Sequence, residues 1–442
     1  MPLPAPVTQA ILPSSFPIVP SIACRARLPS RRRLVDRRTA CLVSVGTGTE
    51  AAMKIAQVET LRADAGWRLF SFLKVTTDDG LVGWSEYSES FGSAGLSSVI
   101  DALTPLIIGR DPTRWEEVTA WLQVMTRQSR GGLNQQAIAA IENALLDIAA
   151  RARGISVAAL FGGPIRERIP VYWSHFASYR VRNAAHIGVP AIRSRADVAR
   201  HAAEVKDRGF KALKTNILVP GPDGSLFQYS PGFGRHAGWP ELNWDNRLLA
   251  ELRAHLRSIR DAVGPEMGIH LDTNFHFRTE GFQRIAETVA PFNLTWLEID
   301  IHDPQALGTI KRMAPCPIAS AETLHGRRDF RPYLEQYSMD VGIVDVIWNG
   351  LGESIKIASL CDVYEVNCAP HNFYGNLCSM ISATFSACIP NFRVMEIDID
   401  SVAWRDEFTP PPVIEDGELV MPTGPGWGVE VNEAAIRARP PK

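Results

Sequence analysis

Short apolar runs separated by longer amphipathic stretches dominate the chain from residue 171 onwards. The runs lie at 171–173, 212–216, 267–272, 294–298, 317–322, 341–346, 365–370 and 393–397. Uninterrupted runs of this length are typical of buried parallel strands, and the stretches between them are typical of the helices that cover such strands. Eight strand-and-helix units predict an α/β fold with a (β/α)8 TIM barrel over residues 171–400.

The first half of the chain has a different pattern. Strand-like segments between residues 53 and 86 are joined by a turn at Asp78-Asp79-Gly80, and helical spacing runs from about residue 97 until Gly162-Gly163. This order predicts a small antiparallel sheet followed by helices. We therefore expect an N-terminal α+β domain over residues 53–170, and a C-terminal segment, 401–442, that returns to it.

Residues 1–52 differ in composition from the rest of the chain. Seven arginines lie between residues 25 and 38, whereas Asp36 and Glu50 are the only acidic residues of the segment. An Arg-rich, acid-poor start is typical of an organelle transit segment, and a wrongly assigned start codon gives the same pattern. Prolines interrupt its apolar stretches, which disfavours a secretory signal. We expect this extension to lie outside the folded core.

Composition excludes several classes of partner. The 442 residues carry a formal net charge of −2, so a general attraction to nucleic acid or to an anionic membrane is not expected. No uninterrupted apolar stretch is long enough to span a membrane. The seven cysteines are scattered, mostly in apolar runs, and indicate free thiols in a reducing compartment. We expect a cytoplasmic protein, or an organelle protein if residues 1–52 are a transit segment.

Polar residues close the later strands at regular intervals. They stand at positions 272, 298, 322, 345, 371 and 396, which is 23 to 26 residues apart. The carboxyl ends of barrel strands converge on one mouth, so these side chains should meet there. Asp272, Glu298 and Glu322 would form an all-oxygen, negatively charged site, which suits Mg²⁺ and also accepts Mn²⁺.

Further residues beside the carboxylates suggest proton chemistry and substrate contacts. Asp345 can hold one ring nitrogen of His371 while the other nitrogen faces the pocket, which makes a general base or acid. Lys214 and Asn216 are two residues apart on one strand, so both should point into the barrel mouth. Lys214 could stabilise an enediolate and have a lowered pKa. His175, at the end of the first barrel strand, is a candidate contact for substrate hydroxyl groups or a second carboxylate.

These motifs as an ordered set resemble the mandelate racemase branch of the mandelate racemase / muconate lactonizing enzyme family, within the enolase superfamily. The resemblance rests on the run at 209–216 (GFKALKTN), the acids at 272, 298 and 322, the Asp345–His371 pair and the segment Pro370-His371-Asn372. It runs from about Met53 to the carboxyl end. It implies a modified (β/α)8 barrel, an α+β capping domain at the N-terminus, one Mg²⁺ per subunit and a homo-oligomer.

The resemblance also implies roles for single residues. Asp272, Glu298 and Glu322 match the metal ligands, His371 with Asp345 matches the base dyad, and Lys214 matches a lysine that contacts the substrate carboxylate. Glu396 matches a donor to the substrate carboxylate or enediolate. Asn274 matches a polar position near the metal, where we expect it to contact substrate.

One departure from the family pattern changes the expected reaction. In the racemases of the branch that this chain resembles, a second lysine stands at the position of Asn216. That lysine is the base on the face of the substrate opposite the histidine. Asn216 cannot act as a base, so it is expected to bind substrate instead. Racemisation needs two bases, whereas dehydration needs one, because His371 could remove the α-proton and then help the β-hydroxyl group leave.

We therefore predict a Mg²⁺-dependent hydro-lyase of carbohydrate acid catabolism, an acid-sugar dehydratase that converts a small sugar acid to a 2-keto-3-deoxy acid. An isomerase, a racemase or a lactone cycloisomerase would share the same enediolate and is the alternative. A remote alternative is a non-catalytic barrel that binds a metal or a sugar acid.

Overall fold

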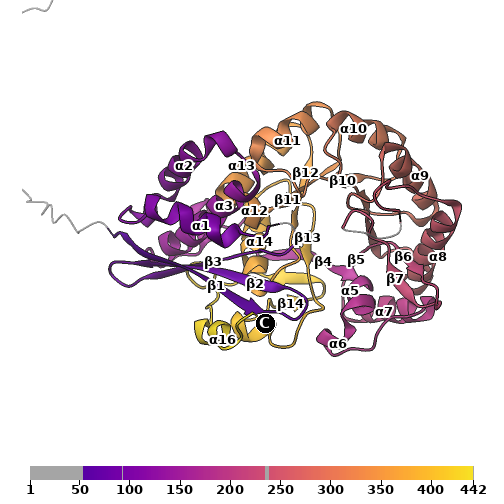
Figure 1. Cartoon of the computed structure of the whole chain (residues 1–442), viewed down its shortest axis with the longest axis horizontal. Coiled ribbons are helices and arrows are strands. Elements are labelled where there is room, and N and C mark those ends of the chain that lie inside the picture. Colours follow the sequence, from indigo (N-terminus) through magenta and orange to yellow (C-terminus); the bar gives the residue numbers. More distant parts are fainter. Residues whose placement is uncertain (1–52, 92, 234–237, 442) are drawn as a thin grey trace, which may run out of the picture. The chain divides into compact units, whose positions relative to one another are not determined.

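The N-terminal part of the protein is a three-stranded sheet covered by helices (Figure 1). The computed structural model describes residues 53–91, 93–233 and 238–441, so the predicted extension at 1–52 lies outside the described residues. The antiparallel strands are β1 (Ile55–Asp64), β2 (Leu69–Thr77) and β3 (Val82–Tyr87). The helices are α1 (Leu96–Leu103), α2 (Trp115–Met125), α3 (Gly132–Arg151) and α4 (Val157–Leu160).

Helix α3 is the centre of this part, because it is buried along almost its whole length. Alanines at 137, 140 and 144 bring its backbone close to the sheet, where they share a core with Leu73 and Val75 of β2. At Gly83 of β3 a Cβ atom would lie 2.3 Å from the carbonyl oxygen of Ala144. Only glycine allows the strand to lie this close to the helix.

Eight parallel strands of the barrel follow. They are β4 (Arg168–Phe176), β5 (Ala212–Thr215), β8 (Gly268–Asp272), β9 (Trp296–Glu298), β10 (Ile318–Ser320), β11 (Val341–Asp345), β12 (Asn367–His371) and β13 (Met395–Ile397). Each predicted run overlaps one of these strands. Hydrogen-bonded neighbours run in chain order from β4 to β12, and β13 pairs with β4. The ring closes where the Arg393 N–H donates to the Cys368 carbonyl oxygen at 2.8 Å.

Helices separate the strands as the sequence pattern predicts. They are α5 (Ser178–Arg182), α6 (Ala184–Ile187), α7 (Arg195–Asp207), α8 (Asn246–Val263), α9 (Thr279–Val289), α10 (Pro304–Met313), α11 (Gly326–Glu335), α12 (Val346–Asn349), α13 (Leu351–Val363) and α14 (Asn376–Cys388). A small hairpin, β6 (Leu218–Pro220) with β7 (Leu226–Gln228), is inserted after β5. After β13 the eighth helix is only the short α15 (Arg405–Phe408), so the barrel departs here from a regular (β/α)8 barrel. The predicted fold class is confirmed.

The last part of the chain contacts both the barrel and the N-terminal sheet. The hairpin of β14 (Ile414–Glu415) and β15 (Glu418–Val420) extends the sheet at β4. The backbone N–H of Trp427 donates to Asp147 of α3 at 3.1 Å, and its indole N–H donates to the Trp84 carbonyl oxygen at 2.9 Å. Helix α16 (Glu433–Ala438) packs against β1. The exact domain limits expected from the sequence, 53–170, 171–400 and 401–442, stay a prediction.

The interior of the barrel is filled by side chains beneath the mouth. Tyr172, Trp296, Ala319 and Ile343 form a buried layer, and the ring of His270 stacks on Trp296 with centroids 3.7 Å apart. Among the described residues, no helix is both long and apolar enough to cross a bilayer. The five cysteines in the described ranges are free thiols, as predicted.

Candidate active site

A cavity of about 540 Å³ lies at the carboxyl ends of the barrel strands. Most of the predicted site residues line it, namely His175, Lys214, Asn216, Asp272, Asn274, Glu322, His371 and Glu396. Glu298 and Asp345 lie directly behind this lining, because each contacts a lining residue and is fully buried. The structure therefore brings all ten predicted residues to one mouth.

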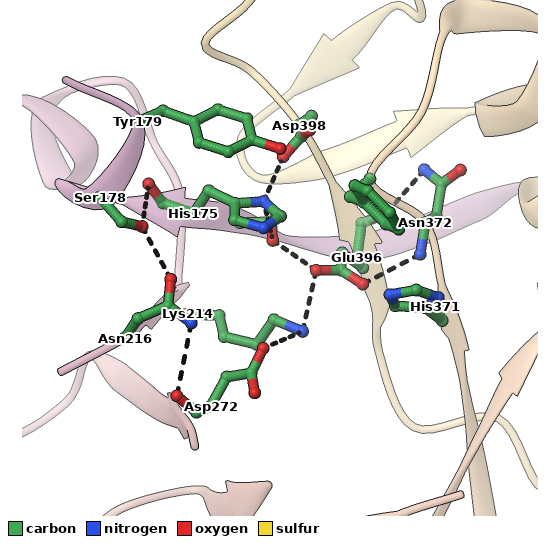
Figure 2. Close-up of polar contacts among 12 residues, drawn as sticks. His175, Ser178, Tyr179, Lys214, Asn216, Asp272, His371, Asn372, Glu396 and Asp398 are labelled. Atoms are coloured by element: carbon green, nitrogen blue, oxygen red, sulfur yellow. Dashed lines mark hydrogen bonds and ion pairs between the residues drawn. The ribbon is translucent and has the colours of Figure 1, made fainter. Parts of the chain in front are cut away.

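Lys214 lies at the centre of the site, among three carboxylates, of which Figure 2 shows Asp272 and Glu396. Its Nζ atom is 2.9 Å from Glu396 Oε1, 3.3 Å from Glu298 Oε1 and 3.5 Å from Asp272 Oδ2. Burial alone would lower the pKa of Lys214, but Glu298 and Glu396 outweigh burial and raise it well above its ordinary value. The expectation of a lowered pKa is therefore wrong, because negative charge around the ammonium group dominates.

Asp272, Glu298 and Glu322 close three neighbouring strands, but in the described ranges no three acidic, histidine or cysteine side chains have the spacing of a metal site. The Lys214 ammonium contacts two of them, and Glu322 lies beside Asp300 and His371. Burial, reinforced by Asp272 and opposed by Lys214, raises the pKa of Glu298 to about 7. Burial and Asp300 likewise raise the pKa of Glu322.

These carboxylates nevertheless suit a divalent cation. Glu322 Oε2 and Asp300 Oδ2 are buried and accept no hydrogen bond from any described residue. Asp272, Glu298, Asp300 and Glu322 are four buried carboxylates beside Lys214 and His371, and oxygen donors of this kind are the ligands that Mg²⁺ prefers. The donor set fits the predicted ion.

The predicted His371–Asp345 dyad is present. His371 Nδ1 lies 2.7 Å from Asp345 Oδ2, and the Tyr374 hydroxyl donates to the same oxygen at 2.6 Å. The backbone N–H of Trp348 donates to the other oxygen at 2.8 Å. Burial opposes charge on His371, but Glu322 and Asp345 outweigh it and raise the pKa of His371 to about 10. Asp345 thus holds the ring with Nε2 toward Glu322, 3.4 Å away.

Glu396 is fixed from three directions at the base of the cavity. It accepts hydrogen bonds from the Ser174 hydroxyl and, at 2.9 Å, from the Asn372 backbone N–H, besides its ion pair with Lys214. Burial would raise the pKa of Glu396, but Lys214 and His371 outweigh it and hold the pKa well below its usual range. Glu396 is therefore a carboxylate that points at Lys214 rather than at open space.

The two predicted asparagines are held by their neighbours. Asn216 accepts from the Ser178 hydroxyl at 2.8 Å, and its amide lies 3.4 Å from the Asp272 carbonyl oxygen (Figure 2). The backbone N–H of Asn274 donates to Asp272 Oδ1 at 3.0 Å, which leaves its side chain at the cavity wall. Asn216 thus presents an amide where a basic side chain would be needed for a second base.

His175 carries a partner that the sequence did not reveal. Its Nδ1 atom lies 2.9 Å from Asp398 Oδ1, and Arg68, in the turn between β1 and β2, donates to Asp398 Oδ2 at 2.9 Å. The His175 ring stacks on Tyr179 with centroids 4.1 Å apart. Asp398 stands two residues after Glu396, so the alternation of a strand could have identified it. Asp300 stands in the same relation to Glu298.

Other lining residues come from helices, loops and the inserted hairpin rather than from the ends of barrel strands. Arg182 reaches the cavity and has no ion pair with a described residue, and Gln228 and Ser230 come from the insertion after β5. Aromatic side chains complete the walls, including Phe91, Phe233 and Phe373. Phe91 lies in the loop after β3 and its ring is 5.6 Å from that of Phe373, so the N-terminal part helps to cover the mouth.

Family models match both parts of the chain. Residues 197–435 match the model described as enolase C-terminal domain-like, and residues 41–162 match the mandelate racemase / muconate lactonizing enzyme N-terminal domain. The chain belongs to this family of the enolase superfamily. The predicted family is therefore confirmed.

Individual members of the family are similar over most of their length. One relative is a protein of Burkholderia xenovorans strain LB400, provisionally named an L-alanine-DL-glutamate epimerase, whose crystal structure is bound to magnesium and fumarate. Its sequence is 45% identical to this chain, and the two structures superpose with a TM-score of 0.86. The match covers 88% of this chain and 96% of that one. D-galactarolactone cycloisomerase of Agrobacterium fabrum is 27% identical, covering 84% of this chain and 90% of the relative. D-xylonate dehydratase of Haloferax volcanii is 25% identical, and the match covers 87% of this chain and 88% of the relative.

Proposed function

We propose that this enolase superfamily member removes the proton next to the carboxylate of a sugar acid and expels the β-hydroxyl group, giving a 2-keto-3-deoxy acid. The observation that carries the proposal is the asymmetry of the site. A complete His371–Asp345 dyad lies on one side, and Asn216 replaces a base on the other. One base suffices for elimination, whereas racemisation needs two.

Each residue of the site has a role in this reaction. His371 Nε2 takes the α-proton in the neutral form of the ring, since Asp345 engages its Nδ1. A cation held by Glu322 would favour that neutral form, because it would offset the carboxylate charge that raises the pKa of His371. Lys214 binds the substrate carboxylate and the enediolate that forms from it, and the ionised Glu396, 2.9 Å from Lys214 Nζ, holds that ammonium group in place. Asn216, Asn274 and His175 contact substrate groups from the cavity wall.

Mg²⁺ fits the carboxylates of the site, and Asp272, Glu298 and Glu322 would hold it, with Mn²⁺ as a substitute. When bound, such a cation neutralises the carboxylates and makes the α-proton of the substrate more acidic. The magnesium in the 45% identical relative supports this choice, and the fumarate there shows that the relative accepts a small carboxylate. Assembly as a homo-oligomer remains a prediction.

The relatives support the reaction class and also an alternative. The Haloferax volcanii relative is named as a sugar acid dehydratase, which agrees with the proposed elimination. The Agrobacterium fabrum relative is named as a lactone cycloisomerase, and a ring oxygen can leave from the same enediolate as a hydroxyl group can. Cycloisomerisation is therefore the second candidate.

The test is incubation of the Mg²⁺-loaded full chain with a panel of aldonates, aldarates and their lactones. A semicarbazide assay detects 2-keto-3-deoxy acids, and NMR in D₂O detects α-proton exchange and ring opening. We expect a 2-keto product that disappears with EDTA and with His371→Asn, but not with His186→Asn, a change of an exposed histidine outside the cavity. Ring opening or exchange without a 2-keto product would replace the dehydratase proposal by the alternative.

A further inference from the structure

The backbone around His175 departs from a regular strand. In the pairing of β4 with β5, Trp173 faces Leu213 and Phe176 faces Thr215, so three steps on β4 match two on β5. The extra residue is a β-bulge, and His175 within it has φ 49°, in the left-handed region that few residues other than glycine adopt. A strained position of this kind is maintained by its surroundings.

The bulge determines where the His175 side chain points. Tyr172 faces the barrel interior, Trp173 packs outward against Phe210, and Ser174 turns inward to Glu396. Simple alternation would send the next side chain outward, toward the helices. Instead the His175 side chain lines the cavity, while Phe176 resumes the outward direction and stacks on His201 at 4.5 Å. Bulges next to active sites commonly re-aim one side chain in this way.

His175 is held like a catalytic histidine. Asp398, which is almost fully buried, contacts its Nδ1 atom at 2.9 Å and so fixes the ring with Nε2 as the free nitrogen. Arg68 holds the second oxygen of Asp398 at 2.9 Å (Figure 2 shows His175 and Asp398). Burial would raise the pKa of Asp398, but His175 and Arg68 outweigh it and keep the group ionised. The arrangement repeats the His371–Asp345 dyad on a different wall.

The two histidines line the same cavity, and the rings of both lie near that of Phe373. The ring centroid of Phe373 lies 5.8 Å from that of His175 and 4.9 Å from that of His371. Elimination needs a base for the α-proton and an acid for the hydroxide that leaves the neighbouring carbon. A second histidine dyad, separate from the first, can supply that acid.

We propose that His175 is the general acid of the elimination, with Asp398 and Arg68 as its positioning residues; this rests on the proposed dehydratase function. His371 takes the α-proton as the C–H bond breaks. The C–O bond of the β-hydroxyl group then breaks, and the leaving hydroxide takes the proton of His175 Nε2 and departs as water. The enol product tautomerises to the 2-keto acid, and solvent returns a proton to His175 and removes one from His371.

The experiment uses His175→Asn in the Mg²⁺-loaded full chain, because asparagine tolerates left-handed backbone and cannot transfer a proton. The probes are the sugar acid that the wild type dehydrates and its 3-deoxy-3-fluoro analogue, since fluoride leaves without an acid. We expect kcat for dehydration to fall at least about 100-fold. Fluoride release and α-proton exchange in D₂O should stay within about threefold of wild type.

Two comparisons make the outcome specific. His371→Asn should lose dehydration, fluoride release and exchange together, and His186→Asn should change none of them. Asp398→Asn should lower dehydration while leaving fluoride release intact, as expected for a positioning residue. Dehydration by His175→Asn within threefold of wild type, a rise in KM alone, or an equal loss of all three readouts would overturn the role of His175. If the wild type dehydrates no sugar acid, the proposed function itself fails, which is a distinct result.

Discussion

The chemistry of His371 depends on a single neighbour, Asp345. This carboxylate is fully buried, contacts His371 Nδ1 at 2.7 Å and accepts hydrogen bonds from Tyr374 and the Trp348 backbone. In Asp345→Asn the amide can hold the ring in the wrong tautomer, with the proton on the nitrogen that must accept one. We expect α-proton exchange in D₂O to fall at least about 100-fold, with little change in KM.

Tyr374→Phe is the matched control for this change, because it removes one hydrogen bond to Asp345 and leaves the carboxylate in place. Its loss of exchange rate should be less than about tenfold, in keeping with one lost hydrogen bond. Equal losses in the two variants would mean that packing around Asp345, rather than its charge, positions His371.

Glu322 is a buried carboxylate beside other carboxylates. Burial, Asp300 and Asp272 make its ionised form unfavourable, as the raised pKa shows, and a cation would relieve this repulsion. Glu322→Gln should therefore raise the thermal stability of the metal-free protein while weakening Mg²⁺ binding at least about tenfold, because a charged ligand is lost. Differential scanning fluorimetry with a Mg²⁺ titration measures both effects. A variant that is less stable than wild type without metal, yet stabilised equally by Mg²⁺, would contradict the assignment of Glu322 as a ligand.

The strands of the barrel differ in how much of their geometry can be predicted from the sequence. Regular spacing of strand ends predicted that Asp272, Glu298 and His371 would meet, since each closes a strand of one barrel. The bulge at His175 has no comparable signal, because it arises from the mismatch of two strands rather than from a local motif. Arg68 lies 330 residues before its partner Asp398, and no periodic pattern connects two such positions.

Helix α3 also acts at this scale, because it holds the start of α13. Glu142 of α3 accepts from the Gly352 N–H at 2.7 Å, and Asn143 accepts from the Leu351 N–H at 3.0 Å. Burial raises the pKa of Glu142 from 4.5 to about 8. The folded protein therefore binds more protons than the unfolded chain between these values, and the free energy of unfolding falls as pH rises from 4.5 to 8.

Glu142→Gln should remove this contribution. Between pH 5 and pH 8.5 the free energy of unfolding of the variant should improve relative to wild type by roughly 4 kcal/mol, whatever the fixed cost of the amide. Urea unfolding at the two pH values measures the change, with Glu117→Gln, a change of an exposed carboxylate on α2, as the control. Parallel pH dependence in wild type and Glu142→Gln would show that Glu142 is ionised throughout.

At the scale of the whole molecule, one apolar core joins the sheet, the barrel and the C-terminal segment. Leu61 and Phe72 of the N-terminal strands belong to the same buried cluster as Trp173 of the barrel and Trp427 of the last segment. From the same N-terminal part, Phe91 lines the cavity and Arg68 holds Asp398, the partner of His175. Loss of the C-terminal contacts should therefore unfold the site along with the sheet.

Substitution of Trp427 tests whether the sheet, the barrel and the C-terminal segment unfold together. Its side chain is 2% exposed, and its indole N–H donates to the Trp84 carbonyl oxygen at 2.9 Å. Trp427→Ala should lower the free energy of unfolding by about 3–5 kcal/mol, and Trp427→Phe by clearly less, because phenylalanine refills most of the volume and loses only the donor. Urea unfolding followed by far-UV circular dichroism and by near-UV circular dichroism should give coincident transitions for both variants. A near-UV transition that precedes the far-UV one would show instead that the C-terminal segment detaches from a barrel that stays folded.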